Sequence, residues 1–67
     1  MRDASFTIDP DTAPTARPPF VVAFVARRPT EACWWVTDGR GVPVAAARRR
    51  AGARAAQARL YQQSGAA

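Results

Sequence analysis

The chain lacks histidine, lysine and asparagine, and it has a single cysteine, Cys33. One cysteine cannot form an internal disulfide, and without histidine beside it there is no ligand set for a structural zinc ion. General bases that work near neutral pH are most often histidines, so the usual acid–base and nucleophilic constellations cannot be assembled. Cys33 stands in an apolar run, which favours a role as a small hydrophobic side chain. We therefore expect a protein that is not an enzyme and that uses no metal or cofactor.

A long apolar segment is also absent. The longest run, residues 20–26, has seven residues, far fewer than the roughly 20 that a membrane-spanning helix needs. Residues 1–5 are not followed by an apolar run of signal-peptide length. Together with the single cysteine, these features favour the reducing cytoplasm of a bacterium or of an infected host cell as the location, and no membrane partner is expected.

The chain is short as well. Its 67 residues allow one small domain, and a core of that size supplies at most about 3–5 kcal/mol of stability. With disulfides and metals excluded, the extra support for the fold is expected from a partner chain, from a nucleic acid, or from self-association into a homo-oligomer.

The charge is basic and unevenly distributed. All ten basic residues are arginine, and five acidic residues leave a net charge of +5. A GC-rich bacterial or phage genome explains arginine in place of lysine, but it does not explain the net charge. Residues 1–38 hold all five acids and four arginines, whereas residues 39–67 hold six arginines and no acid. An acid-free basic half is typical of a surface that meets an anion, such as a nucleic acid or an acidic protein face.

The pattern along the chain predicts strands followed by a helix. Residues 20–28 and 32–37 are β-branched and aromatic, which makes them the two best strand candidates. A shorter third strand is predicted over residues 41–45, with Pro43 on an edge where its missing N–H faces outward. Residues 45–63 predict a helix with a weak apolar face, since its two stripes contain mainly alanine. The expected fold class is therefore α+β, with a small antiparallel sheet of two or three strands followed by one C-terminal helix and preceded by an irregular N-terminal arm.

The same pattern divides the chain into an arm (1–19), a small domain (20–63) and a tail (64–67). The arm contains four prolines, which break helices and remove donors from strand ladders. Phe6 and Ile8 alternate with a polar residue, so a short strand that adds to a sheet edge is the alternative at that point.

The clearest candidate binding surface is the arginine-rich helix. Guanidinium groups neutralise phosphates and can form bidentate hydrogen bonds with them, and they pair equally well with carboxylates. On a helix, Arg50 and Arg54 are neighbours, Arg48 and Arg59 share one side, and Tyr61 could stack on a nucleic-acid base. The alternative is a solvated basic helix with no binding role. The candidate residues for a nucleic acid or an acidic partner are Arg40, Arg48, Arg49, Arg50, Arg54, Arg59 and Tyr61.

Three arginines followed by alanine and glutamine, with an aromatic residue near the end, resemble the arginine-rich RNA-binding helices of lambdoid phage antiterminators. The resemblance is one of composition and is confined to residues 48–61. Those helices stand near the N-terminus of their proteins, whereas this segment is C-terminal. The resemblance implies an exposed helix that binds in a groove of RNA.

The adjacent tryptophans, Trp34 and Trp35, are the second candidate. Neighbouring strand residues point to opposite faces, so one indole is expected in the core and the other outside. Trp34 shares a face with Val36 and is predicted to be buried, which makes Trp35 the predicted interface residue, since an exposed tryptophan beside arginine is typical of binding hot spots. The alternative is that the arm covers the outer indole with Phe6 or Ile8. The expected core partners are Phe20, Val22, Phe24, Val36 and Leu60.

We therefore expect a small basic binding protein, of the kind that serves as an accessory factor of a phage or mobile element, which acts by occupancy on nucleic acid or on a nucleoprotein complex. The rival hypothesis is a protein-binding inhibitor or adaptor that docks on an acidic protein face through its tryptophan and a sheet edge, with arginine at the rim. A small subunit of a larger assembly, folded only in place, is the third possibility.

Overall fold

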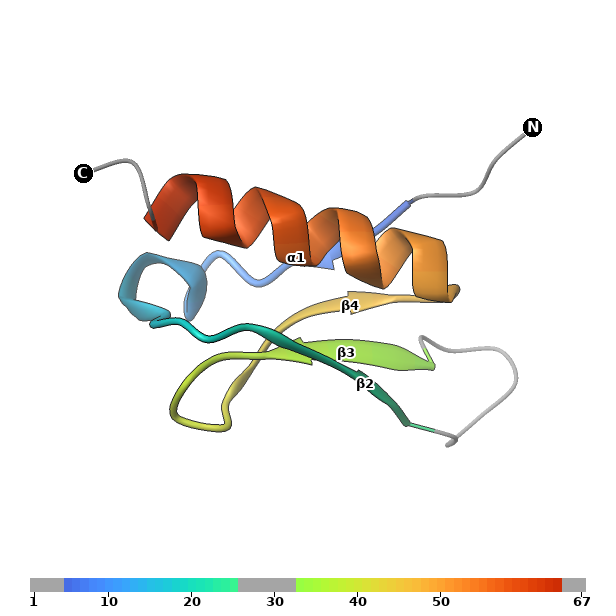
Figure 1. Cartoon of the computed structure of the whole chain (residues 1–67), viewed down its shortest axis with the longest axis horizontal. Helices are drawn as coiled ribbons and strands as arrows, with labels where there is room; N and C mark the ends of the chain where they lie inside the picture. The colour runs from blue at the N-terminus through green and yellow to red at the C-terminus, as the bar shows by residue number, and fades with distance from the viewer. Residues whose placement is uncertain (1–4, 26–32, 65–67) are drawn as a thin grey trace.

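The computed structural model describes residues 5–25 and 33–64, which form a four-stranded antiparallel sheet with one helix packed on one of its faces (Figure 1). The strand order across the sheet is β1-β4-β3-β2. The predicted α+β fold with a C-terminal helix is confirmed, and the sheet has one strand more than expected. In chain order the elements are β1 (Thr7–Ile8), the short 3-10 helix η1 (Ala13–Thr15), β2 (Val21–Phe24), β3 (Trp34–Thr37), β4 (Pro43–Ala47) and α1 (Arg50–Ser64).

The additional strand lies in the segment for which the sequence predicts an irregular arm. β1 pairs antiparallel with β4, with Thr7 opposite Ala46 and Ile8 opposite Ala45. Phe6 and Ile8 pack against the buried core, and this burial of apolar surface favours an ordered strand. The alternative prediction for this segment, a short strand at a sheet edge, is therefore confirmed.

The chain changes from strand to helix later than its composition predicts. Residues 45–47 end β4 instead of beginning a helix, and α1 starts at Arg50. The helix propensity of alanine is a weak preference, and here it is outweighed by pairing, because β4 lies between β1 and β3 and is paired on both sides. Pro43, predicted on an edge strand, instead opens an interior strand. It is the first residue of that strand, which is a position where proline is tolerated.

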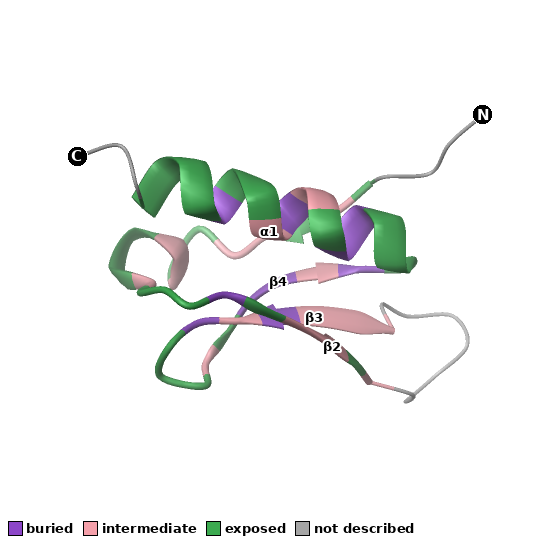
Figure 2. Ribbon diagram, in the orientation of Figure 1, coloured by how far each residue is buried: buried purple, intermediate pink, exposed green. Residues whose placement is uncertain are grey.

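Helix α1 packs on the sheet through small side chains (Figure 2). Of the two stripes that the helical repeat predicts, the one with Ala53, Ala56 and Leu60 is buried. Ala51 and Ala58, in the other stripe, face solvent. The buried core is Phe20, Val36, Val44, Ala45, Ala47, Ala53, Ala56 and Leu60.

Helix α1 approaches the rest of the chain closely at Gly52. A Cβ atom there would overlap the main-chain carbonyl oxygen of Ser5 and would lie 3.0 Å from the Cβ of Ala47. Ser5 lies two residues before β1 and Ala47 ends β4, so a side chain at position 52 would require a shift of the main chain at Ser5. The missing side chain of Gly52 is thus required for the N-terminal segment and α1 to meet.

We expect Gly52→Ala to lower the midpoint of thermal unfolding, although alanine is the better helix former by about 1 kcal/mol. The added methyl group would force the Ser5 segment away from α1. Circular dichroism during heating measures the change. Ala51→Gly, at an exposed position in the same turn, is the control for propensity alone. A Gly52→Ala protein that is more stable than the natural one would contradict the close approach.

Candidate interaction site

The structure distributes the arginines that follow β4 instead of collecting them on one helical face. Arg48 and Arg49 lie in the bend between β4 and α1, before the first helical residue, Arg50. Arg54 and Arg59 lie on α1 itself, and all five side chains are exposed. The expectation that these arginines share one continuous helix is therefore wrong for Arg48 and Arg49, because the pairing of β4 delays the start of α1.

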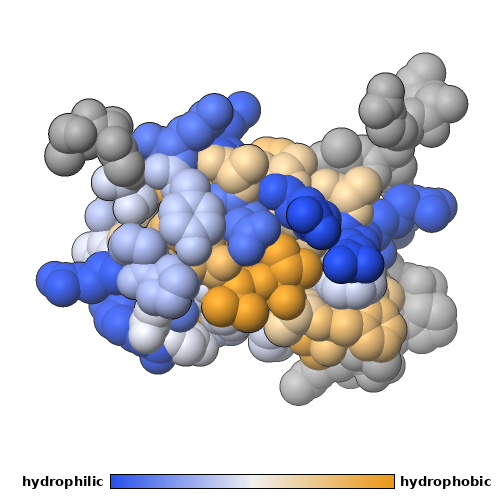
Figure 3. Space-filling view, in the orientation of Figure 1, coloured by the Kyte–Doolittle hydropathy of each residue, from blue (hydrophilic) through white to orange (hydrophobic). Residues whose placement is uncertain are grey.

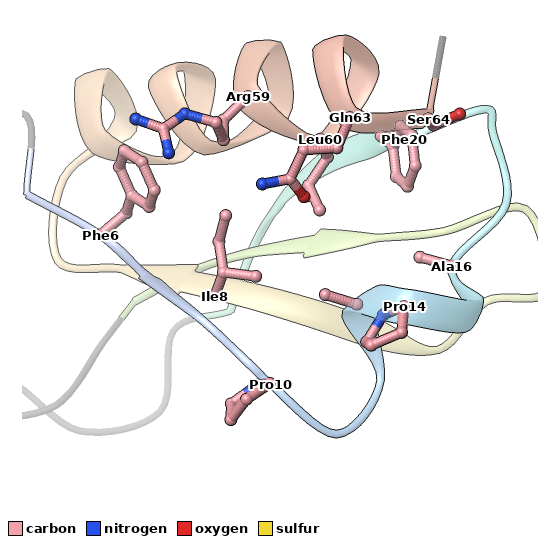
Figure 4. Close-up of a pocket in the computed structure, with 11 residues that line it drawn as sticks. Phe6, Ile8, Pro10, Pro14, Ala16, Phe20, Arg59, Leu60, Gln63 and Ser64 are labelled. Atoms are coloured by element: carbon pink, nitrogen blue, oxygen red, sulfur yellow. The ribbon is translucent and has the colours of Figure 1, made fainter. Parts of the chain in front are cut away.

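The arginines of α1 lie on opposite flanks of the helix. Arg50 and Arg54 line a groove between α1 and β2, whereas Arg59 lines a hollow between α1 and the N-terminal segment (Figure 4). The predicted grouping of Arg48 with Arg59 on one side is not found, since Arg48 precedes the helix. The sheet also covers one face of α1, so this helix differs from the exposed helix that the antiterminator resemblance implies.

Arg40 is held in the turn between β3 and β4. Its Nε atom donates to the Asp38 carboxylate at 3.0 Å, and its Nη2 atom donates to the Thr15 hydroxyl at 3.4 Å. Asp38 also accepts the main-chain N–H groups of Arg40 and Val42, each at 3.0 Å, and that of Arg17 at 3.3 Å. The geometry therefore favours a structural role for Arg40, which joins the turn to η1.

This set of donors determines the acidity of Asp38. Burial by itself raises the pKa of the Asp38 carboxyl group, but the hydrogen bonds from Val42, Arg40 and Arg17 outweigh burial and lower the pKa from 3.8 to about 2. Donors that bind the ionised form favour that form. Asp38 is therefore a buried carboxylate that organises the β3–β4 turn.

Tyr61 is predicted from the sequence to stack on a base. In the structure it binds the main chain at the start of β2, together with Gln57. The Tyr61 hydroxyl accepts the Phe20 N–H at 3.0 Å, and the Gln57 side-chain amide donates to the Phe20 carbonyl at 2.7 Å. The rings of Phe20 and Tyr61 meet edge to face with centroids 4.9 Å apart. These two side chains of α1 thus fix where β2 begins.

Gln57 and Tyr61 continue the row that Arg50 and Arg54 begin. Residues separated by four, three and four positions lie along one side of an α-helix. The row therefore changes along α1 from two arginines to the amide and phenol that hold β2. Sequence reasoning missed the role of Gln57, and its helical spacing from Arg50 and Arg54 was the signal available.

The two tryptophans lie on opposite faces of the sheet, as strand alternation predicts. Trp34 stands opposite Phe24, packs against the core on the helix side, and has its ring 5.0 Å from that of Phe24. Trp35 lies between Ala23 and Ala46. Both indoles are half-buried, so the expected contrast between a fully buried and a fully exposed tryptophan is not found. Phe24, an expected core residue, is 60% exposed because β2 is an edge strand.

The face that carries Trp35 is the one that α1 leaves uncovered. Phe6 and Ile8 do not cover this indole, since both pack against the core on the helix side. A shallow hollow of about 200 Å³ adjoins Trp35, with Thr7 and Pro43 in its lining. Trp35 thus stays a candidate interface residue on the open face of the sheet.

A larger groove, of about 520 Å³, lies between α1 and β2. In Figure 3, apolar surface of the sheet lies directly below strongly hydrophilic side chains. The lining combines an apolar floor with arginine on one wall, and none of the described residues that line it is acidic. We call it the β2–α1 groove, and its lining residues are Phe20, Val21, Val22, Trp34, Arg50, Arg54 and Gln57.

A hollow of about 590 Å³ lies on the other flank of α1. Figure 4 shows Ile8 and Leu60 pointing toward one another across it, with Arg59 and Phe6 at one end. Pro10 and Pro14 of the N-terminal segment form part of its wall. Its apolar surface continues the contact between β1 and α1, and Arg59 is its one charged lining residue.

No helix within residues 5–25 and 33–64 is long and apolar enough to cross a membrane. In the same part of the chain, no group of three or more acidic or cysteine side chains is placed to hold a metal ion. No family model matches the chain, and neither a curated protein nor a solved structure is detectably similar to it. The geometry of the chain itself is therefore the basis for a functional proposal.

We expect Asp38→Asn to destabilise the protein at neutral pH and to remove one acid-sensitive component of its stability. The pKa of Asp38 is about 2 in the folded chain against an ordinary value of 3.8. Its stabilising contribution is therefore complete above about pH 4 and is lost as the pH falls toward 2. Urea unfolding between pH 7 and pH 2 measures this. Asp11→Asn, at an exposed site, is the control. Parallel stability curves for the natural protein and Asp38→Asn would contradict the assignment.

Proposed function

We propose that this chain is a non-enzymatic binding protein that acts by occupancy and docks on an acidic protein face with the side formed by β2 and α1. The observation that supports this is that Phe24, which is 60% exposed, packs against Trp34, and Trp34 lines the β2–α1 groove together with Arg50 and Arg54. Such a protein blocks or recruits its partner by covering part of its surface, as an accessory factor or inhibitor does.

The exposed apolar side chains on this surface are aromatic. The large hydrophobic side chains that are exposed among the described residues are Val21 at 51%, Phe24 at 60% and Tyr61 at 43%. Phe24 and Tyr61 lie on the side of β2 that α1 faces, whereas strand alternation directs Val21 to the opposite face of the sheet. Exposed aromatic side chains near arginine are typical of the centre of a protein interface. This grouping favours a protein partner.

The positive charge of this surface favours an acidic partner. Arg50 and Arg54 are exposed, and neither forms an ion pair within the part of the chain that the structure describes. Guanidinium groups bind carboxylates with two parallel hydrogen bonds. A partner that presents carboxylates around an apolar patch is therefore complementary in both charge and polarity.

We expect a photoreactive benzoyl-phenylalanine placed at Phe24 to cross-link to an acidic protein in a lysate of cells that carry this chain. The substitution is conservative because Phe24 is aromatic and mostly exposed. Mass spectrometry identifies the cross-linked partner. Nuclease treatment distinguishes a protein partner from a nucleoprotein complex.

The same reactive group at Gln62, an exposed position on α1 outside the row that faces β2, is the matched control. The Arg50→Gln, Arg54→Gln double variant should reduce the cross-link at position 24. Equal cross-linking from positions 24 and 62, or products that disappear with nuclease, would contradict a protein-binding surface at β2 and α1.

Nucleic-acid binding is the second candidate function. It is favoured by the succession Arg48, Arg49 and Arg50, which lies exposed at the junction of β4 and α1, with no acidic residue in the first turn of α1. Phosphate contacts by arginine provide affinity without sequence preference. This surface overlaps the proposed protein-binding side only at Arg50.

If nucleic acid is the partner, replacing Arg48, Arg49 and Arg50 by glutamine weakens binding to all sequences alike. The slope of log K against log salt concentration should then flatten by about 0.9 for each lost phosphate contact on duplex DNA. Fluorescence anisotropy with labelled duplex DNA and single-stranded RNA at two salt concentrations measures this. Weak binding by the natural chain, unchanged in the triple variant, would rule out this surface as a nucleic-acid site.

A further inference from the structure

Strand β2 forms one edge of the sheet, and no other strand in the described part of the chain lies beyond it. Its outer side adjoins the β2–α1 groove. The other edge strand, β1, lies across the sheet beside β4. An exposed strand edge next to a groove is the arrangement to which an extended polypeptide can add as a further strand.

The pairing with β3 determines which main-chain groups of β2 face this groove. The Val25 N–H donates to the Cys33 carbonyl at 2.6 Å, so the hydrogen-bonding groups of Val25 point toward β3. Because this direction alternates along an antiparallel strand, the N–H and C=O groups of Val22 and Phe24 point away from β3. The sheet therefore offers two residues with outward donors and acceptors at this edge.

Phe20, two residues before Val22, shows how the edge accepts a partner. Its N–H and C=O groups also point outward, and they are bound by Tyr61 at 3.0 Å and by Gln57 at 2.7 Å. No described residue occupies the corresponding place opposite Val22 and Phe24. Helix α1 thus closes the edge at the start of β2 and leaves the next two outward residues open.

Arg50 and Arg54 form the wall of the groove at this open part. They precede Gln57 and Tyr61 in the same row of α1, and Val22 and Trp34 also line the groove. A strand added to β2 would direct every second side chain to the helix side of the sheet. Glutamate suits those positions, because its methylene groups can contact the apolar lining while its carboxylate reaches a guanidinium group.

We propose that the β2–α1 groove binds an extended acidic segment of a partner protein, which adds to the sheet beside β2. Main-chain hydrogen bonds to Val22 and Phe24 set the register of this segment, and Arg50 and Arg54 select carboxylates at alternate positions. The inference rests on the proposed function and specifies the form of the partner. The partner presents an open strand edge or an unfolded acidic tail.

A second copy of the chain is a poorer occupant of the same edge. β2 itself has no charged residue, and residues 39–67 contain no acid that could pair with Arg50 and Arg54 of another copy. Pairing two β2 strands would also bring two arginine rows to one junction, where like charges repel. Charge complementarity therefore favours an acidic segment of a different protein.

Binding of synthetic peptides, followed by fluorescence anisotropy, tests the inference. The probe is a short peptide of alternating glutamate and valine. One comparison peptide alternates lysine and valine, and another is the glutamate–valine peptide methylated at every backbone nitrogen, which keeps its charge but cannot donate main-chain hydrogen bonds. We expect the unmethylated acidic peptide to bind best, with the methylated form at least about tenfold weaker.

Matched variants of the chain separate charge from strand pairing. Arg50→Gln with Arg54→Gln should weaken binding of the acidic peptide about tenfold, whereas Arg59→Gln, on the other flank of α1, should have little effect. Phe24→Pro removes an outward N–H at an edge position where proline is tolerated. Phe24→Ala keeps that N–H and controls for the lost ring, so the proline variant should bind more weakly than the alanine variant.

Amide hydrogen exchange on the natural protein gives a test that needs no variant to fold. The acidic peptide should slow exchange at the N–H groups of Val22 and Phe24. Equal binding of the methylated and unmethylated peptides, with unchanged exchange at those groups, overturns strand addition. If the Arg50→Gln, Arg54→Gln variant still weakens binding of the acidic peptide in that case, strand addition is excluded but the proposed acidic protein partner is retained.

Two further results bear on both proposals. Preference for the lysine–valine peptide or for duplex DNA over the acidic peptide overturns the acidic protein partner and the strand addition together. A dimer that forms through β2 and excludes the peptide assigns the edge to a second copy of the chain and overturns the inference alone.

Discussion

Gly52, Ala53 and Ala56 let α1 lie close against the sheet, and the other features of the molecule depend on this contact. Because these residues add almost no side-chain bulk, the main chain of the helix reaches β4 and the segment before β1. The same contact fixes the rotation of α1 about its axis. That rotation places Arg50, Arg54, Gln57 and Tyr61 on the β2 side and Arg59 on the opposite flank.

As a consequence, the two edges of the sheet differ in how far they are covered by the rest of the chain. At one edge, β1 completes the pairing of β4, and its apolar neighbours extend the core under α1. At the other edge, Gln57 and Tyr61 of α1 bind Phe20, the residue that directly precedes β2. Edge strands in natural proteins are commonly protected by charge or by a covering element. Here the cover is partial, and the charged side chains among the described residues that line the groove beside the open part are arginines.

Much of the fold follows from local sequence. The β-branched and aromatic segments around β2 and β3, the turn at Asp38-Gly39 and the alanine-rich helix have local preferences that agree with their final structure. Strand alternation alone placed Trp34 on the core side and Trp35 on the opposite face. The acid-free distribution of arginine beyond residue 38 likewise predicted an exposed basic surface without reference to the fold. The absence of histidine is a property of composition that folding cannot change.

Tertiary contacts decided the rest, because several segments have weak or conflicting local preferences. Residues 45–47 favour helix by composition, yet all three pair with β3, and Ala45 and Ala46 pair with β1 as well. The segment with Phe6 and Ile8 becomes a strand only because a core exists for those side chains to join. Arg40 binds the nearby Asp38 and also Thr15, which is distant in sequence, and Tyr61 binds the distant Phe20. The sequence by itself determined which chemical groups this protein can present to a partner. Only the packing of α1 on the sheet decided which of them face the same groove, since the rotation of a helix with two similar alanine stripes is set by what it packs against.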